Sequence, residues 1–253
     1  MLTRAQIQRL AQRNRIGVQV QERDYLQNLL LYLLYNRSQA LAFKGGTAVR
    51  IVYGGNRFSE DLDFNAPADV ELLKSLWQVV SSNLLDFGIF SEIRNSWLSD
   101  VGYSFDVSYQ GPLFDGRDRT KGKVRVDLNL RPEAVETHRA LISPEHDDLR
   151  PFVITVLTPE QLLAEKVRAL LVRSKPRDVY DIWLLIHQGV KMNRALVADK
   201  LALYSLSLTI DSLAAALDKA RLDWKRDLFA LLPQLLNWED IAGELTALWK
   251  VVE

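Results

Sequence analysis

The spacing of apolar side chains predicts a mixed α/β core followed by helices. Apolar residues recur at helical spacing over residues 23–37 and 69–87, so both segments are expected to form amphipathic helices. Short apolar or alternating runs predict strands at residues 40–43, 89–93, 101–109, 123–130 and 152–156. Beyond residue 159 the pattern is helical to the end of the chain.

This order of elements indicates a mixed sheet with flanking helices, followed by a helical C-terminal region. We expect an α/β core with an N-terminal helix over residues 1–157 and a helical domain over residues 158–253. We also expect the helical domain to contribute to an active-site cleft, because ligand sites are common between domains.

A further strand, expected at residues 61–65, carries the most informative polar pattern. Leu62 and Phe64 alternate with Asp61 and Asp63, so both carboxylates should project from one face of the strand. Such a pair can share a hard cation, and sites of phosphoryl transfer often hold Mg²⁺ in this way, with Mn²⁺ as the alternative. The competing interpretation is the polar side of an edge strand.

A glycine turn precedes this strand. Residues 44–47 read Lys-Gly-Gly-Thr and lie between the strand at residues 40–43 and a helix expected over residues 47–53. Gly45 and Gly46 would let the backbone approach a ligand, and the first N–H groups of the helix would face an anion such as a triphosphate. Alone, a Gly-Gly pair usually marks only a turn.

A third carboxylate is expected on the strand at residues 123–130. Its apolar residues alternate with Arg125, Asp127 and Asn129, which should face the opposite side. Asp127 could bind a second metal ion or accept the proton of an attacking hydroxyl. Asp106 stands in a similar alternation on another strand and remains the alternative, and Asp127 could also be only a solvated position.

Two further motifs lie in the helical region. Thr158, followed by proline and then glutamine at the third helical position, begins a helix that carries Lys166 beside its apolar stripe. Lys166 would supply a cation to a triphosphate, or it would extend to solvent as lysines on apolar surfaces do. Asp178 and Asp181 lie one turn apart on the next helix, where acidic residues ordinarily complement the helix dipole.

Together these motifs resemble the nucleotidyltransferase superfamily that includes DNA polymerase beta. Lys-Gly-Gly-Thr, Arg-Phe-Ser-x-Asp-Leu-Asp-Phe, Leu-Leu-Ala-Glu-Lys and Arg-Asp-x-Tyr-Asp more closely resemble the AbiEii family of nucleotidyltransferase toxins, over about residues 22–190. The resemblance implies a cytoplasmic bacterial enzyme of a toxin–antitoxin or phage-defence system. It further implies transfer of nucleotides from a nucleoside triphosphate to an acceptor, which in characterised relatives is the 3′ end of tRNA, and a cognate antitoxin as partner.

Carried onto this chain residue by residue, the resemblance implies three sets of site residues. The metal ligands are Asp61 and Asp63, with Asp127 as the less securely marked third. The other catalytic residues are Lys166 and Asp178. The nucleotide-binding residues are Lys44, Gly45, Gly46, Thr47, Arg57 and Ser59.

Composition narrows the class of protein without identifying the acceptor. The 253 residues hold 32 basic and 32 acidic side chains, and this balance disfavours a protein that coats nucleic acid nonspecifically. There are no cysteines and no uninterrupted apolar run of membrane-spanning length, so we expect a cytoplasmic protein that does not enter a membrane. The histidines at positions 138, 146 and 187 lack the spacing typical of metal ligands, so we assign them no catalytic or metal-binding role.

The connection at residues 116–123 contains four basic residues and leads into the strand of Asp127. It could hold RNA phosphates, and an ordinary solvated hairpin is an equal alternative. The same site residues would also serve an enzyme that nucleotidylates a protein or a small molecule, or a binding module without turnover. The intact carboxylate set disfavours the binding module, and the labelled acceptor would separate the two enzymes.

Overall fold

A computed structural model describes the backbone of residues 1–252 and the side chains of residues 1–247. The chain forms two compact units. The first consists of Met1–Val52 and Phe58–Leu157, and the second of Tyr53–Arg57 and Thr158–Glu253. Among the described helices, none is both long and apolar enough to cross a membrane. The predicted mixed α/β fold class is confirmed.

The first unit is built on a seven-stranded mixed sheet with the order β3-β4-β5-β2-β1-β7-β6. The parallel pairs are β2 with β5 and β1 with β7, and the other neighbours are antiparallel. The strands are β1 (Ala42–Lys44), β2 (Asp61–Asn65), β3 (Phe90–Ser99), β4 (Gly102–Gln110), β5 (Gly122–Asn129), β6 (Thr137–Ile142) and β7 (Phe152–Leu157).

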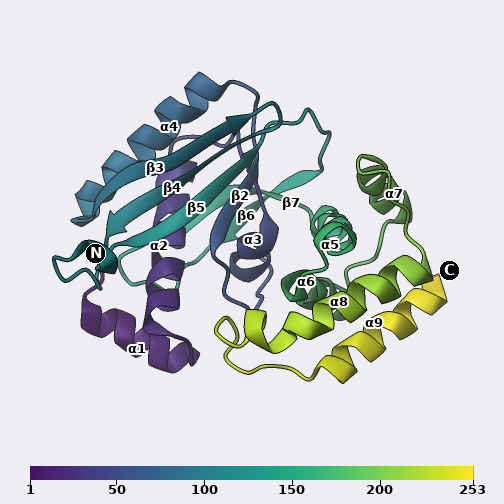
Figure 1. Ribbon diagram of the computed structural model, residues 1–253. Helices are drawn as coiled ribbons and strands as arrows, with labels where there is room; N and C mark the ends of the chain where they lie inside the picture. The colour runs from purple at the N-terminus through teal and green to yellow at the C-terminus, as the bar shows by residue number, and fades with distance from the viewer. Residues whose placement is uncertain (253) are drawn as a thin grey trace. The chain divides into compact units, whose positions relative to one another are not determined.

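Helices cover the apolar face of this sheet. Figure 1 shows α2 crossing behind the strands and α4 alongside β3. Trp77 of α4 packs between Phe64 of β2 and Phe105 of β4, at ring-centroid distances of 5.8 and 5.4 Å. The helical elements of this unit are α1 (Arg4–Asn14), α2 (Val18–Tyr35), α3 (Gly45–Ile51), α4 (Val70–Ser82), and the short 3₁₀ helices at Asn83–Phe87 and Asp118–Thr120.

A helix is present where one was predicted at residues 23–37, but the prediction that it is amphipathic was wrong. The helix α2 is buried on nearly all sides, and its buried positions include Asp24, Gln27 and Asn28. Polar side chains are tolerated there because they find partners: Gln27 Nε2 donates to the Ser59 carbonyl at 3.3 Å, and Asn28 Nδ2 donates to the Asp24 carbonyl at 2.8 Å. A helix that buries polar side chains together with apolar ones does not show a simple apolar stripe along one face.

Two elements have no counterpart in the predicted pattern. The helix α1 is mostly polar and buries only Ile7 and Ala11, and it begins at a capping box formed by Thr3 and Gln6. The strand β6 lies at the edge of the sheet and is largely exposed, so burial does not impose an alternating pattern on it. The helix expected at residues 69–87 divides into α4 and a 3₁₀ turn.

The second unit consists mainly of helices, as predicted for the C-terminal region. Thr158 accepts a hydrogen bond from the Gln161 N–H, and Pro159 is the first residue of α5, which confirms the predicted helix start. The helix α5 packs against α6 and α7, while α8 packs against α6 and α9. The helices are α5 (Pro159–Arg173), α6 (Pro176–His187), α7 (Arg194–Ala202), α8 (Ile210–Leu228) and α9 (Trp238–Val252).

Candidate active site

The strand β2 presents two aspartates on one face, as its alternation predicts. Leu62 and Phe64 are fully buried, whereas Asp61 and Asp63 are half-buried. Because successive side chains of a strand point to opposite faces, both carboxylates project away from the aromatic core.

The parallel neighbour β5 adds a third carboxylate at the same level. The register pairs Asp63 with Asp127 and Asp61 with Arg125. Adjacent strands lie about 4.8 Å apart, so Asp127 stands beside Asp63 and on the same face. Arg125 Nε lies 3.3 Å from Asp127 Oδ1. We call Asp61, Asp63 and Asp127 the carboxylate face; its hard oxygen ligands suit Mg²⁺ or Mn²⁺.

Asp106, the alternative third carboxylate, lies one strand farther away. It is on β4, which β5 separates from β2. Its side chain is buried and accepts a hydrogen bond from Asn95 Nδ2 at 2.9 Å, and Arg125 Nη1 lies 3.6 Å from its Oδ1. Strand order therefore brings Asp127, and not Asp106, next to β2.

The glycine turn packs directly against the carboxylate face. The strand β1 is antiparallel to β2 and pairs Lys44 with Asp63, and Gly45 follows with φ of +76°. A Cβ atom at Gly45 would lie 2.0 Å from Asp63 Oδ2. Only glycine therefore fits, because a side chain would be strained by the backbone angle and would displace the carboxylate.

The other residues of the turn take positions that the sequence did not specify. The helix α3 begins at Gly45, so both glycines lie in its first turn and not before it, where the sequence placed them. Thr47 is fully buried, and its hydroxyl donates to the Asp61 carbonyl. This hydrogen bond fixes β2 relative to α3 and therefore helps to hold Asp61 in position. Ser59 is also buried, just before β2.

The motifs in α5 and α6 form a buried ion network within the second unit. Lys166 is 6% exposed, and its Nζ lies 2.6 Å from Asp181 Oδ2 and 3.6 Å from Asp178 Oδ1. Arg173 donates to both oxygens of Asp178, at 2.7 and 2.9 Å. Lys166 is therefore enclosed by carboxylates and does not extend to solvent. Asp178 is fully buried, and the residue at the N-cap of α6 is Lys175.

Arg57 belongs to the same network. Its Nε and Nη2 each lie 2.9 Å from an oxygen of Asp181, and both side chains are buried. Burial alone would raise the pKa of Asp181, but Arg57 and Lys166 outweigh it and hold the pKa below its usual range. The network thus joins Arg57, Lys166 and Arg173 to the carboxylates of Asp178 and Asp181.

Asp181 is the central residue that the sequence left without a role. It contacts both Arg57 and Lys166, which are far apart in the chain. Its spacing in Arg-Asp-x-Tyr-Asp places it one turn after Asp178, and that spacing was the available signal. Long-range pairing with Arg57 could not be read from the motif itself.

The basic connection between β4 and β5 is partly neutralised by its own acidic residues. Arg117 Nε lies 3.0 Å from Asp115 Oδ2, and Lys121 Nζ lies 2.9 Å from Asp118 Oδ1. Arg119 is exposed. The positive potential available to a phosphate chain is therefore smaller than the four basic residues alone suggest.

Comparison with known proteins agrees with this geometry. MenT4, a nucleotidyltransferase toxin from Mycobacterium tuberculosis H37Rv, superposes with a TM-score of 0.67 and 20% identity, covering 99% of this chain and 90% of that one. JHP933 from Helicobacter pylori superposes with a TM-score of 0.63 and 23% identity, covering 94% of this chain and 93% of that one. At these identities the similarity establishes the fold. No curated protein sequence matches the chain significantly.

A family model supplies the assignment that fold similarity alone does not. The model described as nucleotidyl transferase AbiEii toxin of a type IV toxin–antitoxin system matches residues 30–244, which include the carboxylate face, the glycine turn and the buried ion network. Membership implies a nucleotide substrate and an antitoxin partner. This chain therefore belongs to the AbiEii family of nucleotidyltransferase toxins.

Proposed function

We propose that this chain transfers nucleotides from a nucleoside triphosphate to an RNA acceptor, with the 3′ end of tRNA as the acceptor site, and that it acts as a toxin in phage defence. The observation that carries the proposal is the carboxylate face with Gly45 packed against it. Asp61, Asp63 and Asp127 lie on adjacent strands, and the close approach of Gly45 to Asp63 brings backbone next to the carboxylates.

A divalent cation, Mg²⁺ or Mn²⁺, fits this donor set. Asp61, Asp63 and Asp127 would hold it, since all three offer carboxylate oxygens from one face of the sheet. When bound, such an ion neutralises charge on the phosphates and stabilises the charge that develops in phosphoryl transfer. In the alternative role, Asp127 would accept the proton of the attacking hydroxyl from the same face of the sheet as Asp63.

The glycine turn is the proposed contact for the triphosphate. Lys44, Gly45 and Gly46 would approach the phosphates through backbone N–H groups and the lysine charge. Thr47 is better suited to hold β2 in place, because its hydroxyl already donates to the Asp61 carbonyl. Ser59, directly before β2, is retained as a hydroxyl donor to a phosphate oxygen.

The buried ion network gives Lys166 and Asp178 separate roles in the same reaction. Lys166 would exchange part of its contact with Asp178 and Asp181 for the triphosphate and supply positive charge to it. Asp178, 3.6 Å from Lys166, would either orient the ammonium group or help to deprotonate the acceptor hydroxyl. Arg57 would act through Asp181, which holds both Arg57 and Lys166. Arg57 is therefore proposed as a positioning residue and not as a direct contact to nucleotide.

Two variants test this division of roles. Lys166→Met should lose nucleotide affinity and transfer rate together, by about 1.5 to 3 kcal/mol for a lost charge-assisted contact. Asp178→Asn should slow transfer while nucleotide binding persists. Nucleotide affinity, single-turnover transfer and unfolding should be measured on the same preparations. Normal transfer per folded molecule, accompanied by equal losses of stability, would show that both residues are only structural.

The proposed activity itself is tested by incubating the purified chain with each of the four labelled nucleoside triphosphates, Mg²⁺ and total RNA. We expect label at RNA 3′ ends, enriched in the tRNA fraction. Parallel reactions with cell protein and with small-molecule extract cover the alternative acceptors. Label confined to protein or small molecules would replace the RNA assignment, and nucleotide binding without any transfer would identify a non-catalytic module.

A further inference from the structure

A second group of potential metal ligands lies in the first unit, away from the residues assigned to nucleotide transfer. Asp24 of α2 meets Glu145 and His146, from the connection between β6 and β7, in a cavity of about 250 Å³. One ligand atom from each residue can be chosen so that all three lie within 4.8 Å of one another. We call these three residues the histidine cluster.

His146 gives an independent indication that this cavity takes a ligand. Its side chain is 1% exposed, and neither ring nitrogen has a hydrogen-bond partner among the described residues. Asp24 Oδ2 is 4.0 Å from His146 Nε2, beyond hydrogen-bond distance. Burying an imidazole without partners is costly, and a ligand at Nε2 would remove part of that cost.

The donor set of the cluster suits metal binding. An imidazole without a hydrogen-bond partner in the described part of the chain and two carboxylates each offer one ligand atom within 4.8 Å of the others. Imidazole nitrogens and carboxylate oxygens are common ligands of first-row transition metals.

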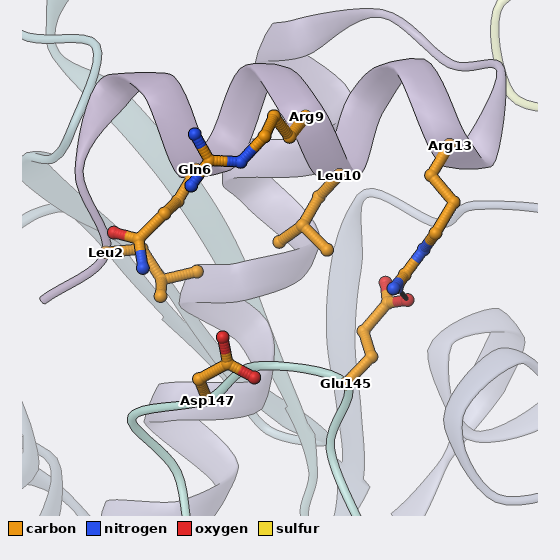
Figure 2. Close-up of a pocket in the computed structure, with 7 residues that line it drawn as sticks. All are labelled: Leu2, Gln6, Arg9, Leu10, Arg13, Glu145 and Asp147. Atoms are coloured by element: carbon orange, nitrogen blue, oxygen red, sulfur yellow. Dashed lines mark hydrogen bonds and ion pairs between the residues drawn. The ribbon is translucent and has the colours of Figure 1, made fainter.

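Neighbouring side chains already orient the two carboxylates. Arg50 Nε lies 3.4 Å from Asp24 Oδ1, which leaves Oδ2 on the side of His146. Asn14 Nδ2 donates to Glu145 Oε1 at 2.9 Å, and Arg13 of α1 reaches toward Glu145 in a neighbouring pocket (Figure 2). Such outer contacts fix ligand orientation in metal sites. The two arginines also oppose a cation, so they lower the affinity relative to the same ligands alone.

We propose that Asp24, Glu145 and His146 bind a divalent transition-metal ion such as Zn²⁺. One imidazole and two carboxylates suit Zn²⁺ and neighbouring first-row ions better than Mg²⁺, which prefers oxygen ligands. Metal–ligand distances of about 2.0 to 2.2 Å require the three ligand atoms to move closer together. Glu145 is partly exposed and would exchange part of its contact with Arg13 or Asn14 for the ion. The ion would link α2 to the connection between β6 and β7.

The test uses the 253-residue chain carrying Asp61→Asn and Asp63→Asn, so that the carboxylate face does not obscure the result. Zn²⁺ affinity is measured by competition with a chromophoric chelator, and Co²⁺ binding by its visible absorption. We expect one ion per chain. His146→Gln and Glu145→Gln should each weaken binding by about 100-fold or more, since loss of an outer contact alone costs 10- to 100-fold. His138→Gln, at an exposed histidine, should leave binding unchanged.

Glu145→Gln guards against misfolding, because Glu145 is partly exposed and its substitution removes no buried packing. Circular dichroism on each variant confirms folding, and added Zn²⁺ should raise the melting temperature of the parent but not of the two ligand variants. Absence of a bound ion in the parent would overturn the proposal. Undiminished binding in Glu145→Gln and His146→Gln would overturn it as well. None of these results depends on transfer activity.

Discussion

The carboxylate face and the buried ion network balance their charges in opposite ways. On the carboxylate face, three aspartates of like charge stand on adjacent strands and are partly open to solvent. In the buried ion network, each carboxylate is enclosed by cations, and Asp178 and Asp181 are at most 1% exposed. Crowded, accessible carboxylates attract a cation, whereas a fully paired network holds its own members in place. The difference predicts opposite responses to substitution.

The largest expected effect is on the carboxylate face. Asp63→Asn keeps the shape that packs against Gly45 but removes a charged metal ligand, so nucleotide transfer should fall by about 10³-fold, or about 4 kcal/mol. Stability should change much less than transfer does, because Asp63 is half-buried and asparagine keeps its shape. Transfer of labelled nucleotide in Mg²⁺ and thermal unfolding measure the two quantities. Near-normal transfer would remove the metal-site assignment.

The reverse pattern is expected for the buried ion network. Asp181→Asn leaves Arg57 and Lys166 buried with less negative charge, which should lower the free energy of unfolding by about 3 kcal/mol. Urea titration measures this loss. Glu71→Gln, which breaks the exposed Glu71–Lys74 pair, is the matched control and should leave the unfolding midpoint unchanged. A similar small shift for both variants would contradict the structural importance of the network.

Gly45→Ala tests how closely the glycine turn and the carboxylate face depend on each other. Positive φ should cost about 1 kcal/mol of stability, and the added methyl group would also displace Asp63. Gly54→Ala is a matched control, since Gly54 also has positive φ, at +66°, but a Cβ there meets no atom within 4 Å. Both variants should lose similar backbone stability, and only Gly45→Ala should lose transfer per folded molecule. Equal transfer in the two would contradict the assignment.

The smallest expected effect concerns the basic connection between β4 and β5. Arg119→Gln should reduce the slope of log affinity for RNA against log salt by about 1, because one phosphate contact is lost. Arg117→Gln should change the slope less, since Arg117 is already paired with Asp115. Filter binding of tRNA over a range of salt concentrations measures both slopes. Identical slopes in the wild type and Arg119→Gln would place the acceptor elsewhere.

The sequence by itself determined which side chains share a face and where strong helix signals begin. Alternation placed Asp61 with Asp63, and Thr158 with Pro159 marked the start of α5, because these features depend on periodicity and local hydrogen bonds. It also carried the family motifs. The predicted elements did not include α1, which is mostly polar, or β6, which is largely exposed at the edge of the sheet.

Tertiary structure decided which distant residues meet. Strand order and register brought Asp127, and not Asp106, beside Asp63. Packing of α5 against α6 enclosed Lys166 with Asp181. In the first unit, the connection between β6 and β7 brought His146 beside Asp24 of α2, although no spacing rule connects these two residues. These contacts depend on long-range packing, which a local sequence pattern does not contain. Burial on packing then shifts the pKa values of the residues involved.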